Sequence, residues 1–196
     1  MPIRSKAYDR KRQRLIAGYA IGPDVLDLGY AQSPNVGLRA FRTVGLDLER
    51  SRQPSGYAEE IVGDAMDLAA SLGQRKFNTI VAAELLEHLE APYAFLRGLH
   101  PFLADGGRLI LSTPNPLGFP IGLCELFRVK RFYYCREHRY AFPARWVERM
   151  LDVAGFEPEA VRAVGLQLIV AAPPCPKCLS YQLVYVARKR AGGGRG

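Results

Sequence analysis

The chain has 196 residues, of which 48% are hydrophobic and 23% charged, a composition that suits one folded domain with a full core. No apolar run reaches membrane-spanning length, and the basic N-terminal stretch lacks a secretory apolar segment, so we expect a cytoplasmic protein. The 27 Lys and Arg residues against 19 Asp and Glu give a net charge of +8, which favours anionic partners without choosing among them.

The N-terminal stretch, residues 6–20, has the spacing of a basic amphipathic helix. Its apolar side carries Tyr8, Leu15, Ile16 and Tyr19. We interpret it as a helix that covers the edge of a sheet and keeps its charged face in solvent. A nucleic-acid-binding arm is the alternative.

A short apolar run at residues 25–28 stops at Gly29 and is typical of a central strand in a parallel sheet. Residues 33–34, Ser and Pro, are placed to open a helix. A second strand ends at Asp47, about 20 residues after Asp27, as in nucleotide-binding βαβ units. A glycine turn lets a ligand approach the backbone, and a carboxylate that ends the next strand can accept the ribose hydroxyls. The pattern therefore predicts a nucleoside site.

The glycine loop departs from the dinucleotide fingerprint. It keeps only the first glycine, with Ala31 and Ser33 as small replacements. A pyrophosphate needs a closer approach to the backbone than Ala31 and Pro34 allow, whereas a nucleoside without phosphates tolerates the looser turn.

Further strands alternate with helices along the chain. Asp67 can cap a helix through Leu72, and a helix is expected from Glu84, with Pro92 opening its second segment. The additional strands are expected at residues 61–62, 77–83, 108–112 and 183–187. This alternation predicts an α/β fold with a doubly wound parallel sheet.

Four stretches of the sequence resemble motifs of the class I S-adenosylmethionine-dependent methyltransferases. VLDLGYA and VGLDLE are similar to the first two motifs of that family. ELLEHLEAPYAFLRGLHPFLADGGRLILSTPNP is similar to the central block of its small-molecule and glycan enzymes. HRYAFPARWVERMLDVAGFEPEAV is similar to its downstream helix. The resemblance covers residues 25–164. It implies a mostly parallel seven-stranded sheet with an antiparallel last strand, and S-adenosylmethionine as cofactor.

The same resemblance implies one methyltransferase domain over residues 1–190, with a variable lid at about 117–142. The lid is rich in aromatic and basic residues, which suits stacked bases, sugars or an anionic acceptor, but equally a lid packed on the domain. The glycine-rich basic tail, residues 191–196, is expected to be disordered.

Binding roles at the strand ends follow from the resemblance. The methionine end of the cofactor would be lined by Asp27, Gly29, Tyr30 and Ala31, with Glu84 close to the transferred methyl. The nucleoside end would be held by Asp47 on the ribose, Leu48 beside the adenine, Asp64 on the adenine amino group and the Ala65 N–H on a ring nitrogen. The alternative is that Asp64 and Asp67 cap helices and bind no ligand.

Two carboxylates and two imidazoles form a candidate metal set. On a helix, Glu84, Glu87 and His88 would share a face, and His138 from HRYAF would complete the set for a divalent ion. This order, with Thr113-Pro114-Asn115 between, resembles small-RNA 3′-end ribose 2′-O-methyltransferases. The alternatives are a polar pocket wall, or a general base at His88 or His138, because imidazoles exchange protons near neutrality.

Four cysteines leave a smaller question open. Cys175 and Cys178 have zinc-ligand spacing, and Cys124 with Cys135 could complete four thiolates; the alternative is reduced thiols.

The resemblance implies a methyltransferase that acts on a small molecule, sugar or glycan precursor by direct in-line displacement, with oxygen as the expected acceptor atom and nitrogen or carbon as the alternatives. The alternatives are a metal-assisted RNA ribose 2′-O-methyltransferase and a catalytically degenerate module that only binds S-adenosylmethionine.

Overall fold

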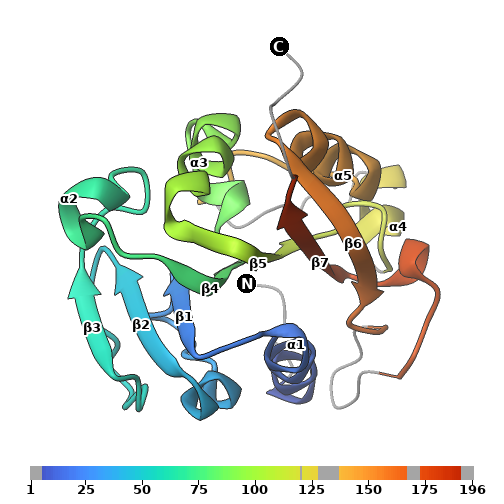
Figure 1. Cartoon of the computed structure of the whole chain (residues 1–196). Coiled ribbons are helices and arrows are strands. Elements are labelled where there is room, and N and C mark those ends of the chain that lie inside the picture. The colour runs from blue at the N-terminus through green and yellow to red at the C-terminus, as the bar shows by residue number, and fades with distance from the viewer. Residues whose placement is uncertain (1–5, 120, 128–136, 167–172, 191–196) are drawn as a thin grey trace.

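The computed structural model describes residues 6–119, 121–127, 137–166 and 173–190, and it is built on a seven-stranded sheet in the order β3-β2-β1-β4-β5-β7-β6 (Figure 1). Neighbouring strands are parallel from β3 to β5, and β7 is antiparallel to both of its neighbours. The strands are β1 (Asp24–Leu28), β2 (Arg42–Asp47), β3 (Glu59–Val62), β4 (Phe77–Ala83), β5 (Leu103–Pro114), β6 (Phe156–Ala163) and β7 (Gln182–Lys189). The predicted doubly wound sheet with an antiparallel last strand is confirmed.

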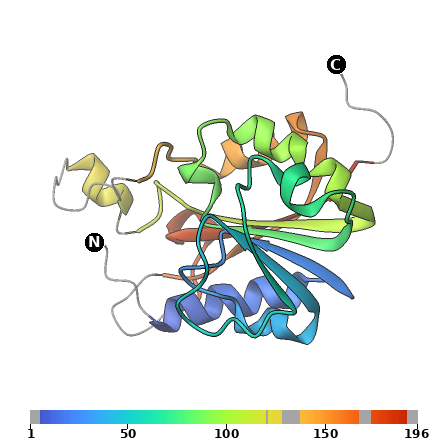
Figure 2. The same ribbon diagram turned by 90° about the vertical axis from the view of Figure 1, so that its left-hand side faces the viewer.

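Helices cover both faces of this sheet (Figure 2). One face carries α1 (Lys6–Tyr19) and the 3₁₀ helix η1 (Val36–Ala40), and the other carries α2 (Leu68–Leu72), α3 (Pro92–Gly98) and α5 (Ala144–Val153). The short α4 (Ile121–Leu126) stands apart at one end, and the remaining 3₁₀ turns are η2 (Leu86–His88), η3 (His100–Phe102) and η5 (Lys177–Leu179). None of the helices in the described ranges is long and apolar enough to cross a membrane.

The core divides into two clusters because side chains of a strand alternate between the two faces. Val25 packs with Tyr8 and Ile16 on the α1 side, whereas Leu26 and Leu28 join the cluster under the opposite helices. Asp27 is two residues after Val25, so its side chain lies on the same face of the sheet and faces α1. The alternation places a carboxylate beneath the N-terminal helix.

A glycine in the second strand makes room around that carboxylate. Gly45 pairs with Asp27 in the sheet register. A Cβ on Gly45 would lie 2.8 Å from the Tyr30 ring and 2.9 Å from the Tyr57 ring. Because these two rings pack 5.5 Å apart, centroid to centroid, only glycine leaves space for the tyrosine pair at this point of β2.

Two predicted helices are shorter than expected. After Gly29 the chain forms η1, which begins after Asn35 instead of at Ser33-Pro34, since the Asn35 carboxamide oxygen accepts from the Gly37 N–H at 3.0 Å. Likewise, the helix expected from Glu84 is only the 3₁₀ turn η2. Glu84 lies before that turn, and its φ of 54° cannot continue a right-handed helix.

Other expected starts are correct. Asp67 caps α2 by accepting from the Ala70 N–H at 3.3 Å, and Pro92 is the first residue of α3. The tail at 191–196 and the part of the lid at 128–136 lie outside the described residues, so the tail, the lid and the domain limits stay predictions.

Candidate active site

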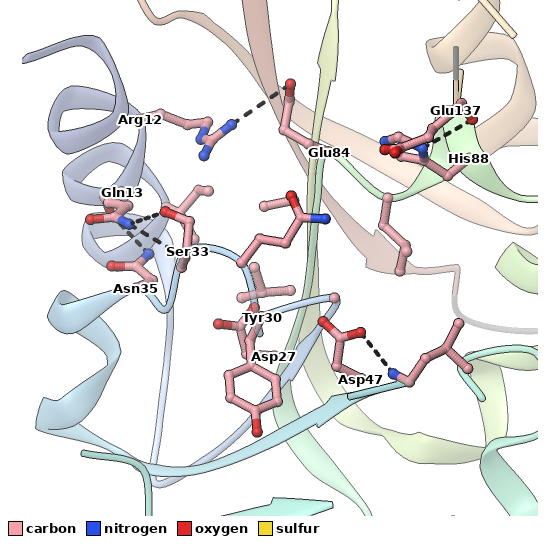
Figure 3. Close-up of a pocket in the computed structure, with 17 residues that line it drawn as sticks. Arg12, Gln13, Asp27, Tyr30, Ser33, Asn35, Asp47, Glu84, His88 and Glu137 are labelled. Atoms are coloured by element: carbon pink, nitrogen blue, oxygen red, sulfur yellow. Dashed lines mark hydrogen bonds and ion pairs between the residues drawn. The ribbon is translucent and has the colours of Figure 1, made fainter. Parts of the chain in front are cut away.

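A cavity of about 250 Å³ lies at the carboxyl ends of the parallel strands, between β1 and β4 (Figure 3). From β1 the chain passes to β2 on one side of β1, and after β3 it returns to form β4 on the other side. Open α/β sheets bind ligands at such a switch point. The ionisable residues that line it include Arg12 from α1, Asp27, Asp47 and Glu84 from the ends of β1, β2 and β4, and His88 from η2.

Asp27 lies at the buried end of the cavity. Its carboxylate accepts from the Tyr57 hydroxyl at 2.6 Å. Burial raises the pKa of Asp27 to about 7, although the Tyr57 hydrogen bond and the Arg12 charge act in the opposite direction. In the ligand-free protein this side chain is therefore partly protonated at neutral pH.

Asp47 ties the end of β2 to the glycine loop. Its two carboxylate oxygens accept from the Ala31 N–H at 2.8 Å and from the Leu48 N–H at 2.7 Å. An ionised carboxylate has about four lone-pair sites, so acceptor capacity remains for a ligand. Gly29, Tyr30 and Leu48 also line the cavity, whereas Ala31 lines a separate hollow.

Glu84 turns its carboxylate toward the strands beside it. The side chain accepts from the Ser112 hydroxyl at 2.9 Å and from the Gln182 amide, and its N–H donates to the Ser112 carbonyl at 2.8 Å. These bonds to β5 and β7 hold the positive φ of a non-glycine residue, a conformation typical of functional sites.

Glu87, His88 and His138 lie together, and of the three only His88 lines the cavity, at the edge that we call its rim. One potential ligand atom from each lies within 4.8 Å of the others. The two imidazole rings meet edge to face with centroids 4.7 Å apart, and Glu87 is 1% exposed. Glu84 is absent from this group because its strained backbone turns it to Ser112. The structure therefore brings together three of the four candidate ligands and leaves Glu84 outside the group, and metal binding stays a prediction.

Backbone hydrogen bonds explain how a residue so distant in sequence reaches His88. The Glu87 carbonyl accepts from the N–H groups of Arg139 at 2.8 Å and Tyr140 at 3.3 Å. The Nδ1 atom of His88 lies 3.1 Å from the Glu137 carbonyl oxygen. Because a carbonyl can only accept, this contact favours the tautomer with hydrogen on Nδ1, which leaves Nε2 as an acceptor.

Asp64 and Ala65 are not among the residues that line this cavity. Asp64 is exposed and accepts from the Met66 N–H at 2.8 Å, while Ala65 packs against the core. Their adenine-binding roles stay predictions. The three described cysteines, Cys124, Cys175 and Cys178, belong to no group of three or more potential metal ligands in the described ranges, and Cys135 lies outside them.

Arg12 is the site residue that the sequence did not single out. It lines the cavity from α1, yet it is only 3% exposed. A signal was present, since Arg12 is four residues from both Tyr8 and Ile16 and so shares their buried face. Gln182 and Tyr57 were missed as well, because each approaches the site from a distant strand or loop.

The family model described as a methyltransferase domain matches residues 3–161. No curated protein sequence matches the chain. Among solved structures, the chain is similar to a possible histamine N-methyltransferase from Thermotoga maritima, with a TM-score of 0.71 and 16% identity over 94% of this chain and 89% of the other.

It is also similar to the 1,6-didemethyltoxoflavin N1-methyltransferase of Burkholderia thailandensis, which was solved with S-adenosylhomocysteine. Here the TM-score is 0.66 and the identity 19%, over 95% of this chain and 80% of the other. For the CcbJ methyltransferase of Streptomyces caelestis, the TM-score is 0.66 and the identity 18%, over 95% of this chain and 91% of the other. Since the family match spans most of the chain, and the fold and strand order agree with it, the chain belongs to the class I S-adenosylmethionine-dependent methyltransferases.

Proposed function

We propose that this methyltransferase transfers the methyl group to a hydroxyl oxygen of a small molecule or sugar. The observation that carries the proposal is the position of His88, an imidazole on the wall of the cavity with Nδ1 against the Glu137 carbonyl. A hydroxyl acceptor must lose a proton during transfer, and an imidazole that carries its hydrogen on Nδ1 has a lone pair on Nε2 that can accept this proton.

The cofactor would occupy the cavity between β1 and β4. The ribose would lie at Asp47 and the amino-acid tail would extend past Asp27 toward Glu84, so that the sulfonium methyl faces the rim. The acceptor oxygen would attack the methyl carbon in line with the sulfur, forming the C–O bond as the C–S bond breaks. S-adenosylhomocysteine leaves as a neutral thioether, and the hydroxyl proton passes to His88. Proximity and orientation supply much of the rate.

The test is a methyl-transfer assay with methyl-labelled S-adenosylmethionine on a panel of alcohols, phenols, sugars, amines and short RNAs. We expect transfer to a hydroxyl compound. Transfer only to amines would refute the oxygen assignment. Calorimetric binding of S-adenosylhomocysteine without turnover on any acceptor would support a module that binds the cofactor but has lost catalysis.

A second candidate is metal-assisted methylation, including that of an RNA ribose, and the Glu87–His88–His138 group favours it. A buried carboxylate and two imidazoles suit a divalent ion. The hydrogen bond between His88 Nδ1 and the Glu137 carbonyl is of the kind that orients a metal-binding histidine. A bound ion would lower the pKa of the acceptor hydroxyl that coordinates it, and Glu87, His88 and His138 would hold the ion in place.

The ribose assignment is tested by Asp47→Ala. Losing hydrogen bonds to a charged group costs about 1.5–3 kcal/mol, so we expect affinity for S-adenosylhomocysteine to fall roughly tenfold or more in calorimetry. Asp105→Ala, at an exposed position in β5, serves as the control and should bind normally. Because Asp47 also holds the Ala31 N–H, the melting temperature is measured alongside. Unchanged affinity would mean that the ribose lies elsewhere.

A further inference from the structure

A surface patch of large apolar side chains lies at the end of the molecule where α4 stands apart, drawn in yellow in Figure 2. We call it the α4 patch, and its exposed members are Leu117, Phe119, Leu123, Leu126, Phe127 and Leu179. Leu126 and Phe127 are 73% and 71% exposed, and none of the six belongs to either core cluster. Single exposed apolar residues are common, but a group of them on one surface marks a site of association.

Backbone hydrogen bonds make the α4 patch one continuous surface. The Phe119 N–H donates to the Leu179 carbonyl at 3.0 Å, which joins the chain before α4 to η5. The Phe127 N–H donates to the Leu123 carbonyl at 3.0 Å and extends the last turn of α4. The six side chains therefore come from segments that lie side by side, although η5 is distant from α4 in the sequence.

The α4 patch lies at the same end of the sheet as the cavity. β5 runs parallel to β4 and ends at Pro114, so the chain that leads to α4 leaves the sheet at its carboxyl end. The Asn115 side-chain amide donates to the Ser180 carbonyl at 3.0 Å, which ties the end of η5 to this point. The cavity lies at the carboxyl ends of the parallel strands. Whatever binds the α4 patch therefore lies on the cavity's side of the domain.

Basic side chains flank the α4 patch. Lys177 is exposed in η5, and Lys6 and Arg10 are exposed on the first turns of α1. The Tyr8 hydroxyl accepts from the Gln182 N–H at 2.8 Å, so the start of α1 lies beside the chain that follows η5. The surface therefore combines apolar and positively charged groups.

An anionic phospholipid bilayer matches this combination. Leu and Phe side chains enter the boundary between headgroups and acyl chains, while Lys and Arg bind anionic headgroups. In the sequence the run RVKR follows Phe127 directly, which gives three cations against the one acidic residue of α4, Glu125. A second copy of the chain fits less well. Each copy has a net charge of +8, and a symmetric contact would bring the same cations together.

We propose that the α4 patch docks the protein on an anionic phospholipid bilayer. The six apolar side chains enter the boundary between headgroups and acyl chains, and Lys177, Lys6 and Arg10 lie against the headgroups. This orientation turns the cavity's end of the sheet toward the membrane, so a lipid-borne acceptor would approach the site from the bilayer. Docking itself depends neither on the identity of the acceptor nor on turnover.

The test is sedimentation of the protein with vesicles of phosphatidylcholine, made with and without phosphatidylserine. The unmodified protein should bind the vesicles that contain phosphatidylserine, and binding should weaken as the salt concentration rises. Leu126→Ser combined with Phe127→Ser should lower the affinity by about tenfold or more, because burial of each large apolar side chain contributes roughly that factor. Lys177→Gln should lower it about fivefold. All the replaced side chains are exposed, so melting temperatures should not change.

Val153→Ser is the matched control. Val153 is also exposed, but it precedes the start of β6, which is parallel to β5, and so lies at the opposite end of the sheet from the cavity. This variant should bind vesicles normally.

Three results would overturn the proposal. The first is failure of the unmodified protein to bind phosphatidylserine vesicles, or equal binding by the double variant. The second is equal binding to vesicles of phosphatidylcholine alone, which would refute an anionic surface as the partner. The third is a dimer of the unmodified protein in analytical ultracentrifugation that becomes monomeric in the double variant and does not bind vesicles. The α4 patch would then be a contact between copies of the chain.

Discussion

His88→Ala should lower the rate of methyl transfer to a hydroxyl acceptor by about 10²–10⁴-fold, the usual contribution of a positioned general base. Affinity for S-adenosylhomocysteine should change little, because His88 lies at the rim, where the acceptor rather than the cofactor is expected. Higher pH should restore part of the activity, as the acceptor then ionises without help. The assay is transfer of the labelled methyl group at saturating cofactor, repeated across a pH series.

The control is the remaining histidine of this three-histidine chain. His100 stacks on Phe156 and contacts the Ala154 carbonyl at 2.7 Å, so it is structural. His100→Ala should lower the melting temperature and leave the rate per folded molecule unchanged. A rate loss equal to that of His88→Ala would show that the effect is not local to the site.

Metal-assisted transfer makes different predictions for the same variants. A chelator should then abolish activity and a divalent ion restore it. His88→Ala and His138→Ala should be similarly impaired and their double variant little worse, because ligands of one ion act as a unit. We expect the chelator to have no effect. Full activity in both single variants would refute both mechanisms and leave binding proximity as the source of catalysis.

Much of this architecture is predictable because it depends on local patterns. The β-branched run at Phe77–Ala83 and the apolar run before Gly29 form strands wherever the sheet places them. Carboxylates that end parallel strands gather at one edge by geometry alone, so Asp47 and Glu84 could be assigned to one site before any contact was known.

What sequence could not supply depends on backbone conformation and on long-range pairing. Helical spacing placed Glu84 with Glu87, but the bonds of Glu84 to Ser112 and Gln182 hold a left-handed backbone that no local pattern signals. The edge strand β6 contains Pro158 and several polar residues, a composition typical of edge strands. Strand propensities therefore do not predict a strand there. Arg12 looked like one more charge on a basic helix.

Asp27→Asn should stabilise the cofactor-free protein at pH 8 and leave it little changed at pH 4. Burial raises the pKa of Asp27 to about 7, from about 4 when unfolded. The folded state therefore retains a proton that the unfolded chain releases between these values. Stability from this group is complete below pH 4 and is lost as the pH rises through 7. Asparagine is neutral throughout and can still accept from Tyr57, so the variant escapes that loss.

The difference in unfolding free energy between variant and unmodified protein should thus grow with pH from 4 to 8 and then level off, reaching at most about 4 kcal/mol. Denaturant titrations at intervals of half a pH unit measure it, with cofactor removed because a bound ligand would add its own stabilisation. The exposed Asp105→Asn should give a profile parallel to that of the unmodified protein. A pH-independent difference for Asp27→Asn would show that Asp27 is already ionised in the folded state. The cavity would then hold a permanent negative charge opposite Arg12, in place of a carboxyl group that ionises when a cationic ligand arrives.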